Sequence, residues 1–271
     1  MLLRLDGVAV SHAGGAQALA PLTLEIRAGE QVALIGPSGA GKTTLLHTLA
    51  LAHKPAAGSL KLFGGDPWTL RHGARHALRK RLFLAPQTPP LPPRQRVVNA
   101  VLAARLPHWG FWRALASLIR PRNPRAAFEA LEAFHLGDKL YSRVDRLSGG
   151  ERQRASLARL LVSSSELFLV DEPLSALDPE LSRVTLAALQ REAYRRSAAL
   201  VCSLHQVDLA LSHFTRIVAL KEGKLAFDLP RGQVSDAMIA ALYGGEHVPV
   251  AGETAPAPVS LPHACMPVTG L

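Results

Sequence analysis

The run GPSGAGKTT, residues 36–44, constrains this chain more than any other feature of its sequence. It follows the apolar run VALI and precedes the apolar run LLHTLA, which is the strand–loop–helix context of a phosphate-binding loop. Its glycines let successive backbone N–H groups converge at a helix N-terminus, where the helix dipole also favours an anion. A Gly-rich turn that matches by chance lacks these flanking elements. The run therefore predicts binding of nucleotide phosphates.

Two side chains of this loop have specific chemistry. Lys42 can reach the β- and γ-phosphates of a nucleotide, and the Thr43 hydroxyl can ligate Mg²⁺. The phosphate contacts are expected from Gly36, Pro37, Ser38, Gly39, Ala40, Gly41, Lys42, Thr43 and Thr44.

A second motif, LFLVDEP, reads as a buried strand that ends in two carboxylates. Ligands bind at the carboxyl ends of the strands in a parallel sheet. Asp171 can therefore hold a water of a Mg²⁺ shell, and Glu172 can polarise an attacking water. The alternative is that the two carboxylates are only an acidic pair at a helix N-terminus. The phosphate loop elsewhere in the chain favours the functional interpretation over this one.

A third motif, LSGGERQR, contains Ser148, Gly149 and Gly150 at the expected start of a helix. Ser148 is a good N-cap, and the two glycines leave backbone N–H groups open to an anion. Taken alone, this motif is an ordinary capped helix. Beside the phosphate loop it is a candidate for a second, separate anion site.

Composition excludes some classes of protein. The chain has 271 residues, of which 48% are hydrophobic, and a formal net charge of +10. This excludes disorder over most of the chain. A membrane-spanning helix needs about 20 apolar residues, and no run here approaches that length. We read no secretory signal, and two cysteines fit a reducing cytosolic compartment.

Short β-rich runs alternate with helical stretches, which predicts an α/β fold with a largely parallel sheet. The predicted strands are 22–26, 31–35, 82–85, 167–171, 200–204 and 216–220. The predicted helices are 42–52, 94–105, 124–135, 149–162, 179–195 and 207–213. Strand signals vanish between residues 87 and 146, which predicts a helical subdomain inserted into a core that ends near residue 245. Residues 246–271 are proline-rich without periodicity and are expected to be a disordered tail.

The positive charge is concentrated in one stretch. Residues 67–128 contain twelve Lys or Arg and no Asp or Glu, so they carry the whole positive excess of the chain. Such a block can bind nucleic acid or an anionic membrane surface, or it can be a solvated face. The few aromatic residues argue against nucleic acid. The stretch also contains an aromatic cluster, Trp109, Phe111 and Trp112, which can belong to the helical core or to an exposed surface.

Six motifs together give the chain a family resemblance. Residues 1–245 resemble the nucleotide-binding subunits of ABC transporters, which predicts a P-loop NTPase (RecA-like) core of the ABC ATPase type. The motifs, in the family's order, are GPSGAGKTT, Gln87 in LFLAPQ, LSGGERQR, LFLVDEP, SALD at residues 175–178 and His205 in SLHQVD.

The resemblance implies ATP and Mg²⁺ as ligands and a head-to-tail homodimer. Ser148, Gly149 and Gly150 of one subunit would bind the γ-phosphate that Lys42 of the other subunit holds. Thr43, Gln87 and Asp171 would surround the metal. Glu172 and His205 would be catalytic, and residues 175–178 would link the two sites.

The resemblance also points to partners and to a branch of the family. The run LHQVDLA and the tryptophan-bearing segment after Gln87 are similar to the phosphonate-importer ATPases, although many of that branch have SGGQQQR where this chain has SGGERQR. This implies integral-membrane permease subunits, a substrate-binding protein acting indirectly, and a peripheral place on the cytoplasmic face of the inner membrane. An exporter subunit and a non-transport ATPase remain alternatives. His12 stands where the family usually has an aromatic residue that stacks on adenine.

Overall fold

The structure is a computed structural model that describes residues 1–11, 14–110, 112, 114–115, 117 and 123–244. Its largest sheet has six strands. In spatial order these are β5 (Leu82–Ala85), β6 (Leu167–Asp171), β7 (Ala199–Ser203), β3 (Gln31–Ile35), β8 (Arg216–Lys221) and β9 (Lys224–Pro230). All neighbouring strands are parallel except β8 and β9, which pair antiparallel. The predicted largely parallel sheet is thus confirmed.

The structure also has a second sheet, which the sequence did not predict. It has three antiparallel strands in the order β2 (Gln17–Ile26), β1 (Leu3–Ser11) and β4 (Ala57–Leu62). Of these, only residues 22–26 were predicted as a strand, and they pair in this sheet rather than in the parallel one. The chain therefore has a β-rich layer that the alternating pattern did not indicate.

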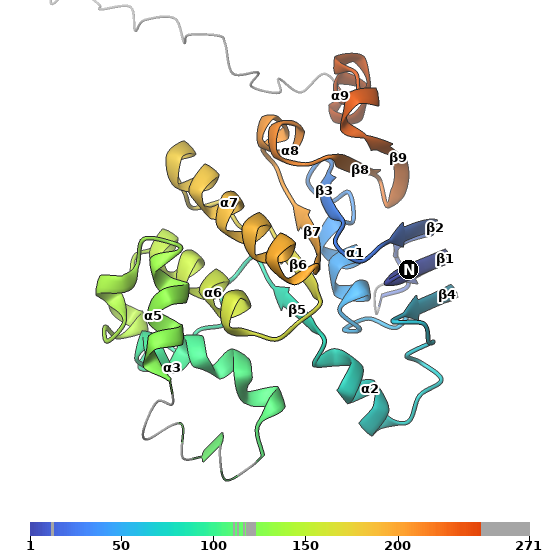
Figure 1. The fold of residues 1–271 in the computed structure, drawn as a ribbon. Coiled ribbons are helices and arrows are strands. Elements are labelled where there is room, and N and C mark those ends of the chain that lie inside the picture. Colours follow the sequence, from blue (N-terminus) through green and yellow to red (C-terminus); the bar gives the residue numbers. More distant parts are fainter. Residues whose placement is uncertain (12–13, 111, 113, 116, 118–122, 245–271) are drawn as a thin grey trace, which may run out of the picture.

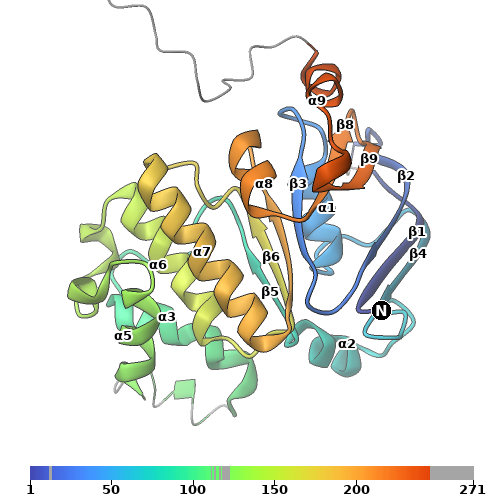
Figure 2. The same ribbon diagram turned by 45° about the horizontal axis from the view of Figure 1, so that its top comes forward.

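The six-stranded sheet lies between two layers (Figures 1 and 2). Helices α6 (Gly149–Val162) and α7 (Pro179–Arg196) cover one face, and α1 (Lys42–Leu49) with the three-stranded sheet covers the other. Side chains alternate between the faces of a strand, and β6 shows the consequence. Phe168 and Val170 pack in the cluster that contains α6 and α7, whereas Leu167 and Leu169 pack with α1 and the antiparallel sheet. Both faces of the central strands are therefore buried, which explains their continuous apolar sequences.

The helices cover both faces of this sheet and extend beyond its β5 edge. They are α1 (Lys42–Leu49), α2 (His72–Arg79), α3 (Val97–Leu102), α5 (Pro124–Glu132), α6 (Gly149–Val162), α7 (Pro179–Arg196), α8 (Val207–His213) and α9 (Asp236–Tyr243). Short 3₁₀ helices span Ala103–His108, Gly137–Lys139, Val144–Arg146 and Arg231–Gln233. The prediction did not include α2 or α9. No helix among the described residues is long and apolar enough to cross a membrane.

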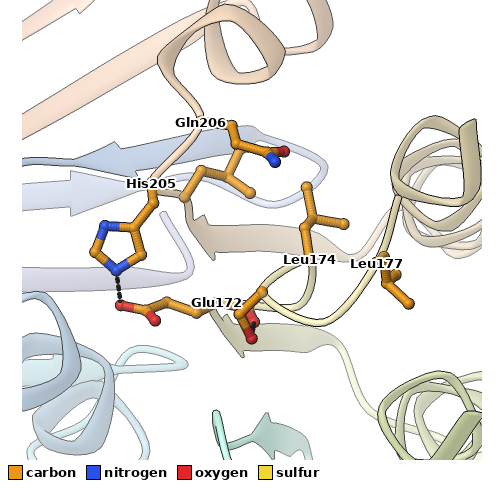
Figure 3. Close-up of a pocket in the computed structure, with 7 residues that line it drawn as sticks. Glu172, Leu174, Leu177, His205 and Gln206 are labelled. Carbon is orange, nitrogen blue, oxygen red and sulfur yellow. Dashed lines mark hydrogen bonds and ion pairs between the residues drawn. The ribbon is translucent and has the colours of Figure 1, made fainter. Parts of the chain in front are cut away.

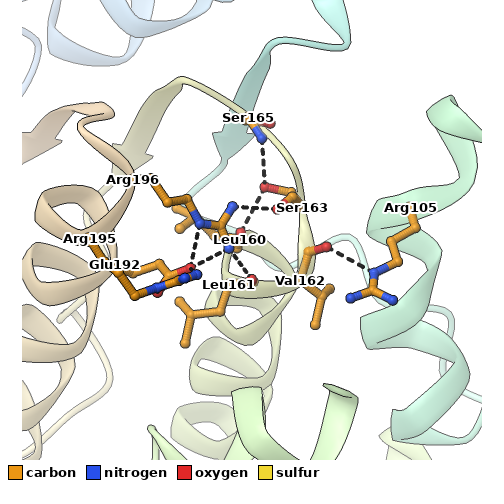
Figure 4. A network of polar contacts seen from close by, with 9 residues as sticks. All are labelled: Arg105, Leu160, Leu161, Val162, Ser163, Ser165, Glu192, Arg195 and Arg196. Carbon is orange, nitrogen blue, oxygen red and sulfur yellow. Dashed lines mark hydrogen bonds and ion pairs between the residues drawn. The ribbon is translucent and has the colours of Figure 1, made fainter. Parts of the chain in front are cut away.

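Two arginines close the C-terminal end of α6, where the chain turns from the helices toward β6 (Figure 4). The last carbonyl groups of a helix have no partner inside it. Arg196 of α7 donates to the carbonyl oxygens of Leu161 and Ser163, and Arg105 donates to that of Val162 at 3.1 Å. These contacts join the helix to two other parts of the fold.

Candidate functional site

The phosphate loop connects β3 to α1 as predicted. Two of its glycines, Gly36 and Gly41, occupy places where a side chain would not fit. A Cβ atom on Gly36 would lie 2.1 Å from the carbonyl oxygen of Leu220, and one on Gly41 would lie 2.6 Å from Leu19 Cδ2. Gly41 also precedes α1 with a φ of 99°, a left-handed conformation that suits glycine. The loop backbone is therefore tightly enclosed by β8 and β2.

Lys42 is buried, and its ammonium group donates to carbonyl oxygens of its own loop. Nζ lies 2.7 Å from the Gly36 oxygen and 3.1 Å from the Pro37 oxygen. Burial lowers the pKa of Lys42, while the carboxylates of Glu172 and Asp171 oppose that shift. A buried cation that has only neutral acceptors would gain by exchanging them for an anion.

The loop opens into a cavity of about 610 Å³. Its lining unites parts of the chain that are far apart in sequence: Gln17, Ala18, Ser38, Gly39, Ala40, Gly41, Lys42, Thr43, Thr44, Gln87, Glu172, His205, Glu222 and Gly223. Most of the predicted phosphate-loop residues therefore share one cavity with the candidate catalytic pair. Gln17, Ala18, Glu222 and Gly223 are additions that the motifs did not reveal.

Glu172 is the point at which the predicted residues meet. Its side chain is 11% exposed and accepts contacts on both carboxylate oxygens. Gln87 Nε2 lies 2.6 Å from Oε2, and His205 Nε2 lies 2.5 Å from Oε1. Figure 3 shows the His205 ring pointing at this carboxylate, beside a further cavity of about 320 Å³ that both residues also line. The arrangement puts an acid–base pair next to the phosphate loop.

The backbone of Glu172 is held in an uncommon conformation. Its φ is 46°, in the left-handed region that few non-glycine residues adopt. Ser203 Oγ accepts the Glu172 N–H at 2.9 Å, and Gln153 Nε2 donates to the Glu172 carbonyl at 3.0 Å. Both peptide groups of Glu172 therefore have partners, which fix the direction of its carboxylate.

Asp171 is buried next to Glu172 and does not itself line the cavity. It is 2% exposed at the end of β6, and its Oδ1 accepts a hydrogen bond of 2.6 Å from Ser203 Oγ. Ser203 thus bridges the two acidic residues. A polar residue at the end of buried strand β7 was the signal that could have identified it, because β7 is the neighbour of β6.

The LSGGERQR motif lies outside the cavity. Ser148 caps α6 with a full capping box, in which its hydroxyl and the Glu151 carboxylate each accept a backbone N–H of the other residue. Ser148 and Gly149 are exposed, and a Cβ on Gly150 would lie 2.8 Å from the Ala176 carbonyl oxygen. The second anion site is therefore not brought to the first within one chain.

Comparisons with known proteins fit this geometry. Residues 19–175 match the family described as ABC transporter. This chain belongs to the ABC transporter family.

Curated relatives of this ABC transporter protein are similar over nearly the whole chain. It is 57% identical to "Phosphonates import ATP-binding protein PhnC 2" of Albidiferax ferrireducens, over 90% of this chain and 89% of the relative. It is 54% identical to a protein of the same name in Pseudomonas aeruginosa, over 92% of this chain and 93% of the relative. The sequence-based resemblance to the phosphonate-importer branch is thus confirmed.

Solved structures of ATP-binding cassettes have the same fold. The dimeric cassette MJ0796 has a TM-score of 0.75 and 24% identity and covers 85% of this chain and 99% of its own. A subunit named cbiO1 from Clostridium perfringens has a TM-score of 0.73 and 19% identity and covers 89% of this chain and 93% of its own. The predicted ABC ATPase fold is confirmed.

Two predictions fall outside the described residues of this ABC transporter protein: His12, the candidate adenine-stacking residue, and the tail at residues 246–271. Strand β2 begins near the first of these, and its residues Gln17 and Ala18 line the cavity.

Some basic residues of the stretch 67–128 make structural contacts, and others are exposed. Arg81 pairs with Glu166 at 2.6 Å, and Arg79 donates to the Leu51 carbonyl at 2.7 Å. Other members, such as Arg71 and Arg94, are exposed. The stretch is therefore not one uniform solvated face. Of the aromatic cluster, Trp112 is 79% exposed, Trp109 is half-buried, and Phe111 lies outside the described residues.

Proposed function

We propose that this chain binds and hydrolyses ATP as the ATP-binding subunit of an importer for a phosphonate or a related oxyanion. One observation carries the proposal: the Glu172 carboxylate lies on the wall of the same cavity as Lys42 and Thr43 of the phosphate loop. A nucleotide whose phosphates rest on the loop would extend toward this carboxylate. The relatives at 54% and 57% identity are named as phosphonate-import proteins, which supports this substrate class.

The phosphate loop accounts for ATP binding. Its backbone N–H groups and the N-terminus of α1 would surround the phosphates, and Lys42 would leave the Gly36 and Pro37 carbonyls for the β- and γ-phosphate oxygens. That exchange replaces neutral acceptors with charged ones, which strengthens each hydrogen bond. The free energy of binding comes chiefly from this loop.

The donor set around the loop fits Mg²⁺. The described residues include no cluster of three His, Cys, Asp or Glu that could hold a metal by itself. Mg²⁺ instead uses few protein oxygens, several waters and the substrate phosphates. The Thr43 hydroxyl and the Gln87 amide oxygen are available at the cavity, and the buried Asp171 would act through a water. When bound, Mg²⁺ neutralises phosphate charge.

Glu172 and His205 account for hydrolysis. The oxygen of a water forms a bond to the γ-phosphorus, and the bond from that phosphorus to the β–γ bridging oxygen breaks, which leaves ADP and inorganic phosphate. Glu172 would orient the water and accept its proton. His205, which contacts Glu172 in this structure, would donate a hydrogen bond to the γ-phosphate.

A second copy of the chain would complete the site. Ser148, Gly149 and Gly150 do not line the cavity, although the start of α6, where they lie, suits an anion. A head-to-tail homodimer would bring them to the γ-phosphate bound by the partner's loop. Residues 175–178 would lie at the same interface, since Gly150 already contacts the Ala176 carbonyl region.

The permease partner follows from the importer assignment. We infer a peripheral place on the cytoplasmic face of the inner membrane, with a substrate-binding protein acting indirectly through the permease. The exposed arginines of residues 67–128 would face the anionic leaflet, where each basic residue contributes about 1 kcal/mol. Trp112 and its neighbours would contact the permease, because exposed aromatic residues serve as interface anchors.

Two measurements test the proposed function. The first is ATP binding by the purified chain: the wild type and the control Lys54→Ala should bind, and Lys42→Ala should not. The second is growth of a strain lacking its own phosphonate-import ATPase, with this chain and its permease supplied and methylphosphonate as the only phosphorus source. Normal ATP affinity in Lys42→Ala would refute the phosphate-loop assignment. ATP hydrolysis without phosphonate-dependent growth would refute the substrate class alone.

A further inference from the structure

The last residue of α9 reaches the first residue of the phosphate loop. Tyr243 is half-buried, and its hydroxyl oxygen accepts a hydrogen bond from the Gly36 backbone N–H at 3.2 Å. The two residues are 207 positions apart, and α9 lies beyond residues 19–175, where the family match lies. No motif in the sequence indicates this contact.

The Cα atom, the carbonyl oxygen and the N–H group of Gly36 each have a close neighbour. The carbonyl oxygen of Leu220 lies where a Cβ would be, at 2.1 Å, so the residue is pressed against β8. Its own carbonyl oxygen accepts a hydrogen bond of 2.7 Å from Lys42 Nζ. Its N–H has Tyr243 as partner. Of these contacts, the one from Lys42 must break when the lysine moves to a phosphate, whereas the one from Tyr243 need not.

The place of Tyr243 is itself fixed by three other contacts of α9. Lys221, the residue after Leu220, donates to the Ala241 carbonyl at 2.6 Å. Ile239 and Leu242 are buried in the main core. Ser235 caps the helix by accepting the Met238 N–H. The helix therefore lies near β8, where both ribbon views place it (Figures 1 and 2), and holds the phenol at a set position.

We propose that Tyr243 is a positioning residue for the phosphate loop. This inference rests on the proposed ATP-binding function. By keeping the Gly36 N–H paired while Lys42 exchanges its partners, Tyr243 holds the first turn of the loop in the conformation that binds phosphate. Without the hydroxyl, that turn samples other conformations, and ATP binding must order it. The C-terminal helix thus sets part of the affinity of a site it does not line.

Tyr243→Phe tests this directly, because it removes the hydroxyl and keeps the ring. The matched control is Tyr194→Phe, at a tyrosine of α7 that is 82% exposed. In Tyr243→Phe we expect the Kd for ATP to rise about 2- to 10-fold, the range for one hydrogen bond, with kcat at saturating ATP within about 2-fold of wild type. Amide hydrogen exchange at Gly36, followed by NMR, should become faster in Tyr243→Phe and stay unchanged in the control.

A second variant separates positioning from general stability. Lys221→Met removes the anchor of α9 without touching the loop or the phenol, and it should raise the Kd in the same direction by a smaller factor. A lower Tm in Tyr243→Phe with wild-type Kd and wild-type Gly36 exchange would overturn the inference, because a merely structural tyrosine would behave that way. If the wild type itself fails to bind ATP, the proposed function is wrong, which is a different result.

Discussion

The Nε2 atom of His205 lies 2.5 Å from the Oε1 atom of Glu172, and this contact joins the ends of two neighbouring parallel strands. Gln87 occupies the other carboxylate oxygen. The acid–base pair is therefore assembled within one chain, and its members are paired with each other. Binding of a terminal phosphate would need His205 to turn from the carboxylate toward the phosphate, which leaves Glu172 able to accept a proton.

His205→Ala should lower the rate of hydrolysis far more than the affinity for ATP. A lost hydrogen-bond donor to a transition-state oxyanion costs about 10²- to 10³-fold in kcat. Steady-state phosphate release and equilibrium ATP binding measure the two effects separately. His76→Ala, at an exposed histidine of α2, is the control and should change neither. A wild-type kcat in His205→Ala would remove this histidine from the mechanism.

Ser203→Ala should destabilise the chain and slow hydrolysis together. The Ser203 hydroxyl is fully buried, donates to Asp171 and accepts the Glu172 N–H, so its loss leaves two buried groups without that partner. An unpaired buried group costs about 1–3 kcal/mol of unfolding free energy. Urea denaturation and phosphate release check the two effects.

Ser182→Ala is the matched control for Ser203→Ala. Ser182 is equally buried in α7, but its hydroxyl has no hydrogen-bond partner among the described residues. Its replacement should therefore be neutral or stabilising. Equal losses in the two variants would show that the Ser203 bridge contributes nothing beyond an ordinary buried serine.

The bounds of a helix or strand were predictable where its pattern of apolar residues is regular. Strands β3, β5 and β6 and helices α6 and α8 have the predicted bounds. Strand β1 was missed because bulges shift its register, so the alternation of buried residues breaks after Leu5. Helix α2 was missed because it is short and polar and none of its residues is buried, so it lacks the run of apolar residues that indicates a helix packed on a core.

The candidate site was predictable where residues are consecutive in a motif. The phosphate loop, Glu172 and His205 share one cavity as expected. Ser203 and Tyr243 were missed because their contacts depend on strand order and on the docking of α9. Neither property follows from local sequence, although the position of Ser203 at the end of a buried strand was a usable signal. Ser148, Gly149 and Gly150 were expected to act in a second subunit, and their distance from the cavity in one chain leaves that prediction to be tested.

Acid should weaken the ion pair between Glu192 and Arg196, the arginine that donates to the carbonyl oxygens at the C-terminal end of α6. Burial would raise the pKa of Glu192, but hydrogen bonds and charge from Arg195 and Arg196 hold it below the ordinary value of 4.5. Because the folded pKa is the lower one, the stabilisation is present above pH 4.5 and is lost as pH falls through the folded value. The Tm difference between wild type and Glu192→Gln should therefore be largest near neutral pH and shrink below pH 4.5. A difference that stays constant across this range would contradict the ion-pair account.

The rate of phosphate release by Glu172→Gln at saturating ATP and Mg²⁺ tests the central claim, that hydrolysis occurs at the Glu172 carboxylate beside the phosphate loop. Removing a general base costs about 10²- to 10⁴-fold in rate, while the amide is the same size and leaves the phosphate contacts in place. The expected result is a rate at least 10²-fold below wild type, with ATP affinity retained and Glu180→Gln unchanged. Hydrolysis by Glu172→Gln at the wild-type rate would contradict the claim.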